Sequence, residues 1–376
     1  KGEAALRIQP AFAVDAVGKR VDATMTLEGD DLTVSIDPTG LTYPIVLDPV
    51  VEVPIWQLVS SATLPASDGN GLVYSAGLGR SMLLGGSTTT GLNCPAAGNY
   101  NSTVYTWNGT TWATSTGSFP RYMPAISSFG SGAILFGGCD GTGNLGDTWT
   151  LSGSTWTKVC NSGACGVAAA RGAQLAYLSS YGAVLFANTD ATQPNYGATY
   201  RFVSGGTSWT LRPYTSAERA NTYMPPARAW GVMTADSVQQ KLLLFGGSDP
   251  TSVLGPALAD AWTFDPTQPG TNSSNSAWKI VCGPGSLKGC PIAPRIRPAG
   301  AYDANRKKHV IFGGQTGSGS GAINDTWEYD MATDTWVELC SSCAPTRRQA
   351  TLVYDAVRRR LVSAAGENFG LTNQTY

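Results

Sequence analysis

The chain has 376 residues and a net charge of −1 at pH 7, and charged residues make up only 14% of it. This composition argues against a basic surface for nucleic acid, and no apolar run reaches the roughly 20 residues that span a bilayer. The 45 glycines and 22 prolines indicate many turns rather than long helices. We therefore expect an all-β protein.

Residues 1–53 differ from the rest of the chain. Stretches such as RVDATMTL (20–27) and LTVSIDP (32–38) alternate apolar and polar residues, as half-buried strands do, and turn residues separate them. They predict a small β-rich module or the tail of a preceding domain. We expect the chain, from Lys1 to Tyr376, to be a processed or partial segment of a longer protein. We also expect this module to contact neighbouring domains or to support self-assembly.

An internal repeat organises the chain from residue 54 onward. An apolar run that ends in two small residues occurs six times, at intervals of roughly 50 to 67 residues. An aromatic pair and, in most copies, a further tryptophan follow it. The runs are SMLLGG (81–86), AILFGG (133–138), AVLFAN (183–188), LLLFGG (242–247), HVIFGG (309–314) and LVSAAG (361–366). The alternating β-branched and aromatic residues predict four short strands per unit.

The glycine pair and the tryptophan each have a physical reason in such a unit. A glycine pair suits a strand that turns sharply against neighbouring backbone, where a Cβ would obstruct the contact. A tryptophan fills the space between adjacent sheets and buries about 150–250 Å². Four-stranded sheets repeated radially form a β-propeller, which leaves only short, protected edges.

This pattern resembles the kelch repeat, in which four apolar residues and a double glycine precede an aromatic residue and then a tryptophan. The resemblance implies an all-β, six-bladed kelch-type β-propeller over residues 54–376, with a small N-terminal β module. The third and sixth copies depart from it, with Ala187-Asn188 and Ala365-Gly366 in place of Gly-Gly. The sixth unit lacks its last tryptophan, so we expect the strand around Trp56 to complete blade six. The alternative is that residues beyond 376 supply that strand.

Eight cysteines with close local spacings favour disulfides and an oxidising compartment, and therefore a secreted or cell-surface protein. Reduced thiols in a cytosolic protein are the alternative. In the topology that the resemblance implies, the loops after the glycine pair and after the last tryptophan emerge on one face of the propeller. The predicted disulfides on this face are Cys94–Cys139, Cys160–Cys165, Cys282–Cys290 and Cys340–Cys343.

The same face carries the longest loops, and we predict that it binds the ligand, because loops held by a rigid scaffold commonly bind. Stapling against proteolysis, without any ligand, is the alternative. Five arginines lie 16 to 18 residues before a glycine pair, near the predicted mouth of the central channel. There they would clamp a carboxylate or phosphate, or they would serve structure, as at this point of many kelch repeats. The candidate ligand-binding residues are Arg121, Arg171, Arg228, Arg297, Arg348, Asp140, Asn188, Asp249, Gln315 and Glu367.

The residue types give limited support to an enzyme. The copper site of galactose oxidase, a kelch-like enzyme, needs two histidines, and this chain has only His309. One CxxC motif, at 340–343, is too little for a zinc site, and CDGTGNLGD (139–147) lacks the terminal glutamate of a calcium loop. We expect no metal and no cofactor. A metal-independent enzyme, similar to a sialic-acid mutarotase, would use Glu367, Arg228 and Arg297.

These observations predict an extracellular or cell-surface binding or adhesion module for a protein or glycan ligand. The first alternative is a glycan-modifying enzyme at the channel mouth. The second is a structural unit of an extracellular filament or a large surface protein.

Overall fold

The computed structural model describes residues 7–8, 11–29, 31–48, 51–52, 56–59, 64–89, 93–190, 193–220, 224–250, 255–271, 275–284, 286, 288–317, 321–342, 345–367 and 372–376. Among these residues the protein is all-β, with one short helix, α1 (Ser216–Ala220). The chain divides into two compact units, Lys1–Trp56 and Gln57–Tyr376.

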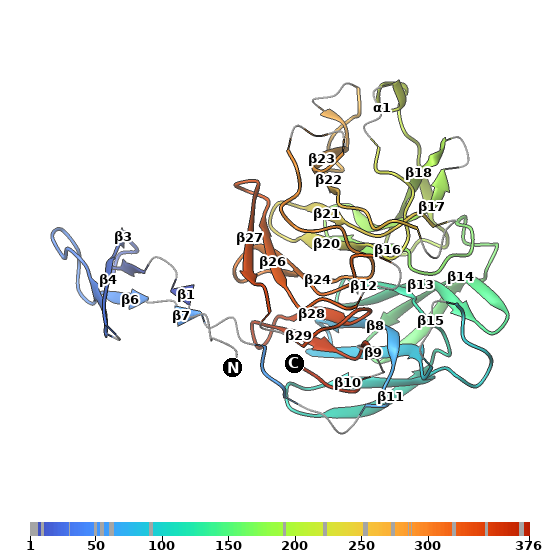
Figure 1. Ribbon diagram of the computed structural model, residues 1–376, viewed down its shortest axis with the longest axis horizontal. Helices are drawn as coiled ribbons and strands as arrows, with labels where there is room; N and C mark the ends of the chain where they lie inside the picture. Colours follow the sequence, from blue (N-terminus) through green and yellow to red (C-terminus); the bar gives the residue numbers. More distant parts are fainter. Residues whose placement is uncertain are drawn as a thin grey trace. The chain divides into compact units, whose positions relative to one another are not determined.

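The smaller unit consists of small antiparallel sheets (Figure 1). Its sheets are β1 (Arg7–Ile8) with β7 (Val51–Glu52), β3 (Arg20–Asp22) with β2 (Phe12–Val14) and β6 (Val46–Asp48), and β4 (Thr24–Glu28) with β5 (Asp31–Ser35). Asp15 fixes the turn after β2, because its Oδ1 accepts hydrogen bonds from the backbone N–H groups of Val17 and Lys19.

The larger unit repeats one antiparallel sheet six times, and we number these sheets in chain order. The first five sheets have four strands each, which follow one another in the chain, and the sixth has two. Sheet one is β8 (Asp68–Ser75), β9 (Arg80–Ser87), β10 (Thr103–Trp107) and β11 (Trp112–Ser118); sheet two is β12 (Ala125–Phe129), β13 (Gly132–Asp140), β14 (Gly143–Ser152) and β15 (Thr155–Cys160); sheet three is β16 (Gln174–Leu178), β17 (Gly182–Asp190), β18 (Gln193–Phe202) and β19 (Thr210–Arg212). Sheet four is β20 (Val232–Asp236), β21 (Lys241–Phe245), β22 (Ala261–Phe264) and β23 (Trp278–Cys282); sheet five is β24 (Ala299–Asp303), β25 (Lys308–Phe312), β26 (Thr326–Asp330) and β27 (Thr335–Cys340); sheet six is β28 (Thr351–Asp355) and β29 (Arg360–Ala364).

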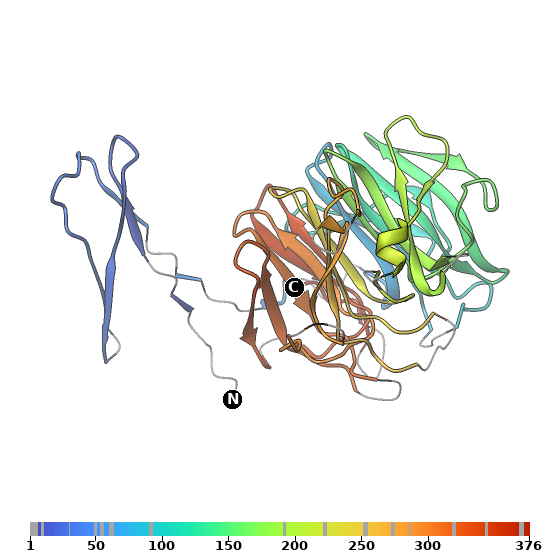
Figure 2. The same cartoon turned by 90° about the horizontal axis from the view of Figure 1, so that it is seen from above.

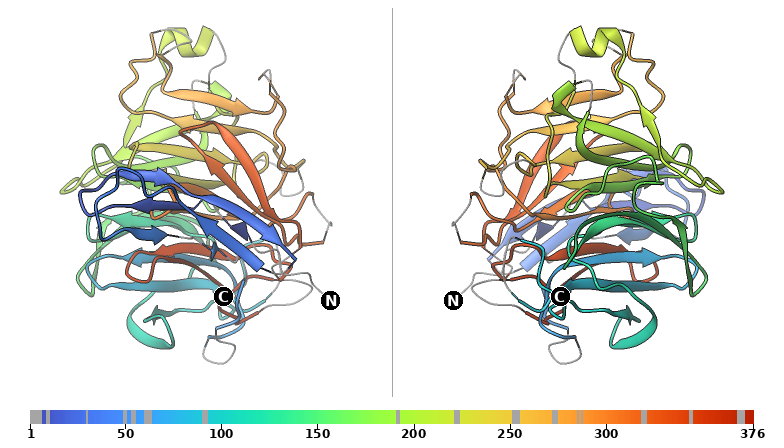
Figure 3. Two further views of the ribbon diagram at one scale, coloured as in Figure 1. Left: turned by 90° about the vertical axis from the view of Figure 1, so that its left-hand side faces the viewer. Right: turned by 90° about the vertical axis from the view of Figure 1, so that its right-hand side faces the viewer.

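The first strands of the sheets, which we call the inner strands, contact one another in cyclic order. β8 contacts β12, and the series continues through β16, β20, β24 and β28. β28 then contacts β8 again, and Figure 1 shows β28 and β29 beside β8 and β9. Figures 2 and 3 show the sheets from three other directions. This arrangement is compatible with a β-propeller.

The glycine pairs connect neighbouring sheets. In sheet two, the N–H of Gly138 donates to the carbonyl of Ala170, in the segment that leads into sheet three, at 2.8 Å. Gly137 and Gly138 have φ of 60° and 93°, and a Cβ on Gly137 would lie 2.4 Å from the Ala170 oxygen. The predicted close approach of the pair to neighbouring backbone is therefore confirmed. Equivalent bonds join Gly86 to Arg121, Gly247 to Arg295, Gly314 to Arg347 and Gly366 to Ser67.

The last of these bonds, from Gly366 to Ser67, joins sheet six to sheet one.

The two copies of the repeat that lack a glycine pair differ from each other in backbone conformation. Ala365 adopts the same left-handed backbone as a glycine, with φ of 59°. Ala187 is not among the described residues with positive φ, and β17 instead continues to Asp190.

The tryptophan of the fourth strand, or just before it, forms a second kind of contact between neighbouring sheets. Trp209 Nε1 donates to Thr148 Oγ1 of the preceding sheet at 2.9 Å, and Trp278 Nε1 donates to Thr199 Oγ1 at 3.0 Å. Trp112 of sheet one makes the same bond to Thr375 Oγ1 at 2.8 Å. The contact therefore also spans the junction between the start and the end of the larger unit.

Residues 372–376 extend sheet six. Ser363 and Tyr376 exchange backbone hydrogen bonds of 2.9 Å, and Ala364 forms a bridge with Thr375. On the other side, the N–H of Val59 donates to the Thr375 carbonyl at 2.9 Å. A segment from the beginning of the larger unit thus joins the last sheet. Trp56 itself falls in the smaller unit, so its role as the sixth outer tryptophan stays a prediction.

The segment that follows the glycine pair of sheet two is a hairpin. β13 runs to Asp140 and β14 begins at Gly143. Cys139 consequently lies in a strand, and its backbone pairs with Tyr122 in the segment that leads into sheet two. Cys139 and Asp140 pair with Asn144 and Gly143, so the pairing of β13 with β14 continues beyond the glycine pair.

We predict that Thr375→Val lowers the free energy of unfolding by about 1–3 kcal/mol, because the buried indole N–H of Trp112 loses its acceptor. The variant Val104→Thr should raise the free energy of unfolding by up to about 1 kcal/mol. The buried Trp156 N–H has no partner among the described residues, and Trp156 packs in the same cluster as Val104, so the new hydroxyl would offer it an acceptor. Urea unfolding of both variants measures the effect. Thr114→Val on exposed β11 is the control, and a Thr375→Val variant as stable as this control would contradict the prediction.

Candidate functional site

The five predicted arginines occupy three different positions before the inner strands. Arg121 and Arg228 lie four residues before the first residue of β12 and β20, Arg171 and Arg348 lie three residues before β16 and β28, and Arg297 lies two residues before β24. Successive side chains of an extended segment point in different directions. The five arginines therefore do not occupy equivalent positions relative to the inner strands.

Arg121 and Arg228 are used inside their own sheets. Arg121 forms a buried salt bridge with Asp147 at 2.8 Å, and its Nη1 also donates to the Gly137 carbonyl at 2.9 Å. Arg228 repeats the arrangement with Asp260 at 2.6 Å and with the Gly246 carbonyl. We call this arrangement the arginine clamp.

The clamp also holds a tryptophan and occurs in a further sheet. The carboxylates of Asp147 and Asp260 accept the indole N–H groups of Trp149 and Trp262. Burial alone would raise the pKa of Asp147, but hydrogen bonds and charge from Arg121 outweigh burial and lower it. In sheet five the clamp consists of Arg295, Asp325 and the Gly313 carbonyl, and in sheet six Arg347 binds the Ala365 carbonyl and Gln374.

One residue of each sheet, two positions after the clamp arginine in the sheets that have one, belongs to a hydrogen-bonded series that passes from sheet one to sheet six. We call this series the axial ring; its members are Gly69, Met123, Gly172, Trp230, Arg297 and Gln349. In five of the six, the N–H donates to the carbonyl of the ring residue in the preceding sheet, at 2.8 Å for Met123, 3.1 Å for Gly172, 2.8 Å for Trp230, 2.7 Å for Arg297 and 3.2 Å for Gln349. All six have positive φ, between 51° and 64°. Four of them are not glycine, and such left-handed backbone concentrates at functional sites.

A cavity of about 150 Å³ lies at the axial ring, and we call it the ring cavity. Every member of the ring lines it, together with the residue that follows each of them in the chain. The Cys94–Cys139 disulfide packs in the same buried cluster as Tyr122, Met123 and Trp230. The cavity therefore lies near the end of the sheets where the second strand leads to the third and the fourth leads to the next sheet. We call this end the loop face.

A buried hydrogen-bond network adjoins the ring cavity. Arg348 Nε donates to Glu367 Oε1 at 2.5 Å, and Arg348 Nη1 donates to Gln315 Oε1 at 2.6 Å. Gln349 Nε2 donates to Glu367 Oε1 at 3.1 Å. The structure thus brings together three residues that the sequence proposed for the ligand site, namely Gln315, Arg348 and Glu367.

The network continues to residues that the sequence did not propose. Gln349 Nε2 also donates to Asp68 Oδ2 at 2.9 Å, and Tyr122 Oη donates to Gln349 Oε1 at 2.7 Å. The Asp68 and Tyr122 side chains are completely buried. Gln349 therefore joins the Asp68 and Glu367 carboxyl groups through one amide.

Several polar atoms around the ring cavity have no hydrogen-bond partner among the described residues. Arg297 is only 5% exposed, yet its Nε and Nη1 have none, and the same holds for Trp230 Nε1 and Asp68 Oδ1. The Arg297 guanidinium lies 5.8 Å from the centroid of the Trp230 ring. Burying a polar group without a partner costs free energy, so these atoms require an explanation.

The electrostatics of the network favour a neutral Asp68. Burial, and then repulsion by Glu367, raise the pKa of Asp68 to about 8, although Arg297 and Arg348 act in the opposite direction. Burial likewise raises the pKa of Tyr122 and lowers that of Arg297. At neutral pH the Asp68 carboxyl is therefore mostly protonated and carries no charge.

The remaining predicted residues lie elsewhere. Arg171 Nη1 is 2.6 Å from Cys94 Sγ, so this arginine faces the disulfide. Asp140 Oδ1 accepts the Thr142 N–H at 2.8 Å and closes the turn between β13 and β14. Asp249 is exposed, and the side chain of Asn188 lies outside the described residues. His309 is fully buried with Nδ1 2.7 Å from Thr234 Oγ1, and burial lowers its pKa to about 4.

The structure contains three of the predicted disulfides, and they lie on the loop face. They are Cys94–Cys139, Cys160–Cys165 and Cys282–Cys290. Cys340 is also disulfide-bonded, but its predicted partner, Cys343, lies outside the described residues. The three disulfides indicate an oxidising, extracellular environment.

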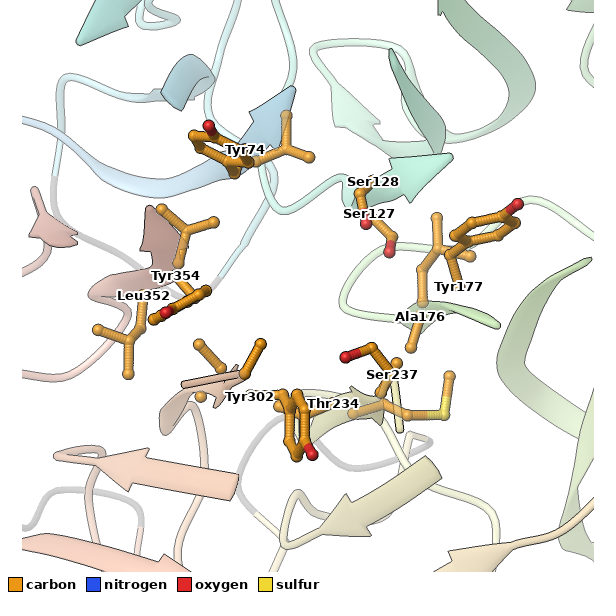
Figure 4. Close-up of a pocket in the computed structure, with 18 of the residues that line it drawn as sticks. Tyr74, Ser127, Ser128, Ala176, Tyr177, Thr234, Ser237, Tyr302, Leu352 and Tyr354 are labelled. Atoms are coloured by element: carbon orange, nitrogen blue, oxygen red, sulfur yellow. The ribbon is translucent and has the colours of Figure 1, made fainter. Parts of the chain in front are cut away.

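A second cavity, of about 340 Å³, lies between the middle parts of the six inner strands (Figure 4). Tyrosines from four of these strands surround it, namely Tyr74, Tyr177, Tyr302 and Tyr354. No charged side chain of the described residues lines it, and the Thr234 hydroxyl on its wall already contacts His309. The Tyr302 hydroxyl also lacks a hydrogen-bond partner among the described residues, but it is a neutral group. The ring cavity, which is lined by an arginine with unpartnered donors, is therefore the stronger candidate site.

No known protein family matches the sequence, and no curated protein matches it either. Among the described residues, no three side chains that commonly ligate metals lie close enough together to hold an ion. The described part of the chain also has no helix with the length and apolar composition of a membrane span. The geometry of the ring cavity is thus the basis for assigning a function.

We predict that Arg228→Met lowers the free energy of unfolding by about 3–5 kcal/mol, because it leaves the buried Asp260 carboxylate without its counter-ion. Arg297→Met should leave stability unchanged or slightly higher, because this guanidinium has two unpartnered nitrogens and the equivalent ring residue of sheet two is already a methionine, Met123. Chemical unfolding of the two variants tests the contrast. Equal destabilisation would contradict the assignment of Arg228 to structure and of Arg297 to a site.

We also predict that Asp68 makes the protein less stable as the pH rises from 5 to 8. Its pKa is raised in the folded protein, so the folded state keeps a proton that the unfolded chain releases, and stability falls by up to about 1.4 kcal/mol per pH unit. Asp68→Asn removes this contribution. The stability of this variant relative to the wild type should therefore increase with pH, as measured by urea unfolding at several pH values. A constant difference would show that Asp68 ionises normally.

Proposed function

We propose that the larger unit is a six-bladed kelch-type β-propeller in which residues 57–59 complete the last blade. Support comes from the repeated four-stranded sheets and the cyclic contacts between inner strands. The bonds from Gly366 to Ser67 and from Trp112 to Thr375 repeat, across the junction, contacts found between other neighbouring sheets. The axial ring supplies one equivalent residue from each of the six sheets.

We further propose that the protein is a secreted or cell-surface binding module, and that the loop face of the propeller binds an extracellular protein or glycan. The observation that carries this proposal is the ring cavity, where buried donors converge without partners among the described residues. A binding site needs preorganised polar groups that a ligand can satisfy. The disulfide between Cys94 and Cys139 links two blades beside this cavity and limits the entropy lost on binding.

A metal-independent glycan-modifying enzyme is the second candidate function. One observation favours it: Asp68, whose pKa is raised, and Glu367, which is salt-bridged to Arg348, meet at Gln349 beside the cavity. Two carboxyl groups in different electrostatic environments can serve as acid and base. Arg228 has no part in this candidate, because the clamp holds it. The described residues offer no specific observation for a structural unit of a filament.

The loop face is tested by a glycan array and a pull-down of extracellular proteins with the full chain as bait. We expect the double variant Asp140→Arg/Asp249→Arg, on the loop face, to lose at least about tenfold in ligand capture, because added charge and bulk obstruct docking there. The matched control is Val238→Arg/Val357→Arg, on exposed turns at the opposite end of the sheets. Equal capture by both double variants would contradict a ligand site on the loop face.

A further inference from the structure

We propose that the ring cavity binds the carboxylate group of a small acidic ligand of about monosaccharide size, with Arg297 as its counter-ion. This inference rests on the proposed binding function and names the chemical class of the ligand. It is carried by the polar atoms that the fold buries around the cavity and leaves without a partner.

The unpartnered atoms are mainly donors. Arg297 offers Nε and Nη1, and Trp230 offers Nε1, all buried and without an acceptor among the described residues. Both residues line the ring cavity. A carboxylate only accepts hydrogen bonds, so it satisfies these donors without introducing a new unpaired donor. A neutral hydroxyl group would satisfy them less well, because it supplies no charge to balance the buried guanidinium.

The backbone shows that these side chains are held in place. Trp230 and Arg297 are consecutive members of the axial ring, and the Arg297 N–H donates to the Trp230 carbonyl at 2.7 Å. Both have φ of 59°, which disfavours side chains of this size. Gly172, the preceding ring member, leaves room for the indole, because a Cβ there would lie 2.7 Å from Trp230 Nε1. The site is therefore preorganised by the ring.

The charges around the cavity select a monoanion. Arg348 is balanced by Glu367 in a salt bridge at 2.5 Å. Arg297 Nε and Nη1 have no hydrogen-bond partner among the described residues, and the guanidinium contributes one positive charge. One carboxylate balances it, whereas a dianionic phosphate would add negative charge close to Glu367. The raised pKa of Asp68 fits this balance, because a neutral Asp68 neither neutralises Arg297 nor repels the ligand.

The remaining walls suit the carbon skeleton of a small ligand. Met123, Pro124, Pro298 and Ala350 line the cavity beside the polar groups. A volume of about 150 Å³ accommodates a molecule of monosaccharide size but not a folded peptide segment. Small-molecule sites are commonly lined by apolar side chains together with a few polar groups that point to the ligand.

Titration of the full chain with D-glucuronate, D-glucose and D-glucose 6-phosphate tests the proposal, with calorimetry and saturation-transfer NMR as readouts. Glucuronate and glucose differ only in a carboxylate that replaces a hydroxymethyl group. We expect glucuronate to bind at least about tenfold more tightly than either of the other two sugars. Arg297→Met should weaken glucuronate binding at least about tenfold, and Trp230→Phe, which removes the N–H donor together with one ring of the indole, should weaken it several-fold.

The control variant is Arg80→Met, which removes an exposed arginine at the start of β9 and should leave binding unchanged. Glucose binding as tight as glucuronate binding, tighter binding of the phosphate, or an undiminished affinity in Arg297→Met would overturn the proposal. So would the absence of saturable glucuronate binding. If the loop-face variants lose their captured ligand while Arg297→Met does not, the binding function stands and the carboxylate assignment fails. If glucuronate binds through Arg297 but no ligand depends on the loop face, only the proposed function fails.

Discussion

The axial ring is the constraint on which the rest of the larger unit depends. Six segments from six sheets meet there, and each N–H from Met123 to Gln349 reaches the carbonyl of the preceding ring residue. All six ring residues adopt left-handed backbone, whether or not they are glycine. The ring fixes the spacing of the inner strands and directs the side chains of Trp230 and Arg297 toward one cavity. The same constraint thus builds the sheet arrangement and the candidate site.

Arginine has two different uses around this ring. In the clamp, Arg121, Arg228 and Arg295 are neutralised by a carboxylate and also satisfy the first glycine carbonyl of their sheet. Removing one partner of such a buried pair would leave an uncompensated charge, which is strongly destabilising. The pairs therefore hold the clamp residues in place. Two positions further along, Arg297 has the same burial but no such partner among the described residues. A shift of two residues in register therefore separates a structural arginine from one available to a ligand.

Much of the fold could be predicted from the sequence, because the repeat has local physical causes. The glycine pairs were expected at close backbone contacts, and the Gly137 and Gly138 geometry confirms this. Three predicted disulfides also form. The candidate site was harder to predict. Its ring members are Gly, Met, Gly, Trp, Arg and Gln, which share backbone conformation but no side-chain chemistry. Asp68 and Gln349, which are 281 residues apart, meet only because sheet six lies beside sheet one.

The sequence by itself determined the class of the fold and the repeating unit, and it predicted three of the disulfides. These properties follow from patterns within about 50 residues, such as strand alternation, glycine pairs and cysteine spacing. Only the tertiary structure decided which arginines are neutralised and which face a cavity. That distinction depends on register relative to the inner strands and on carboxylates that are distant in the chain. Neither is encoded in local spacing, because hydrogen bonds and charges act between neighbours in space.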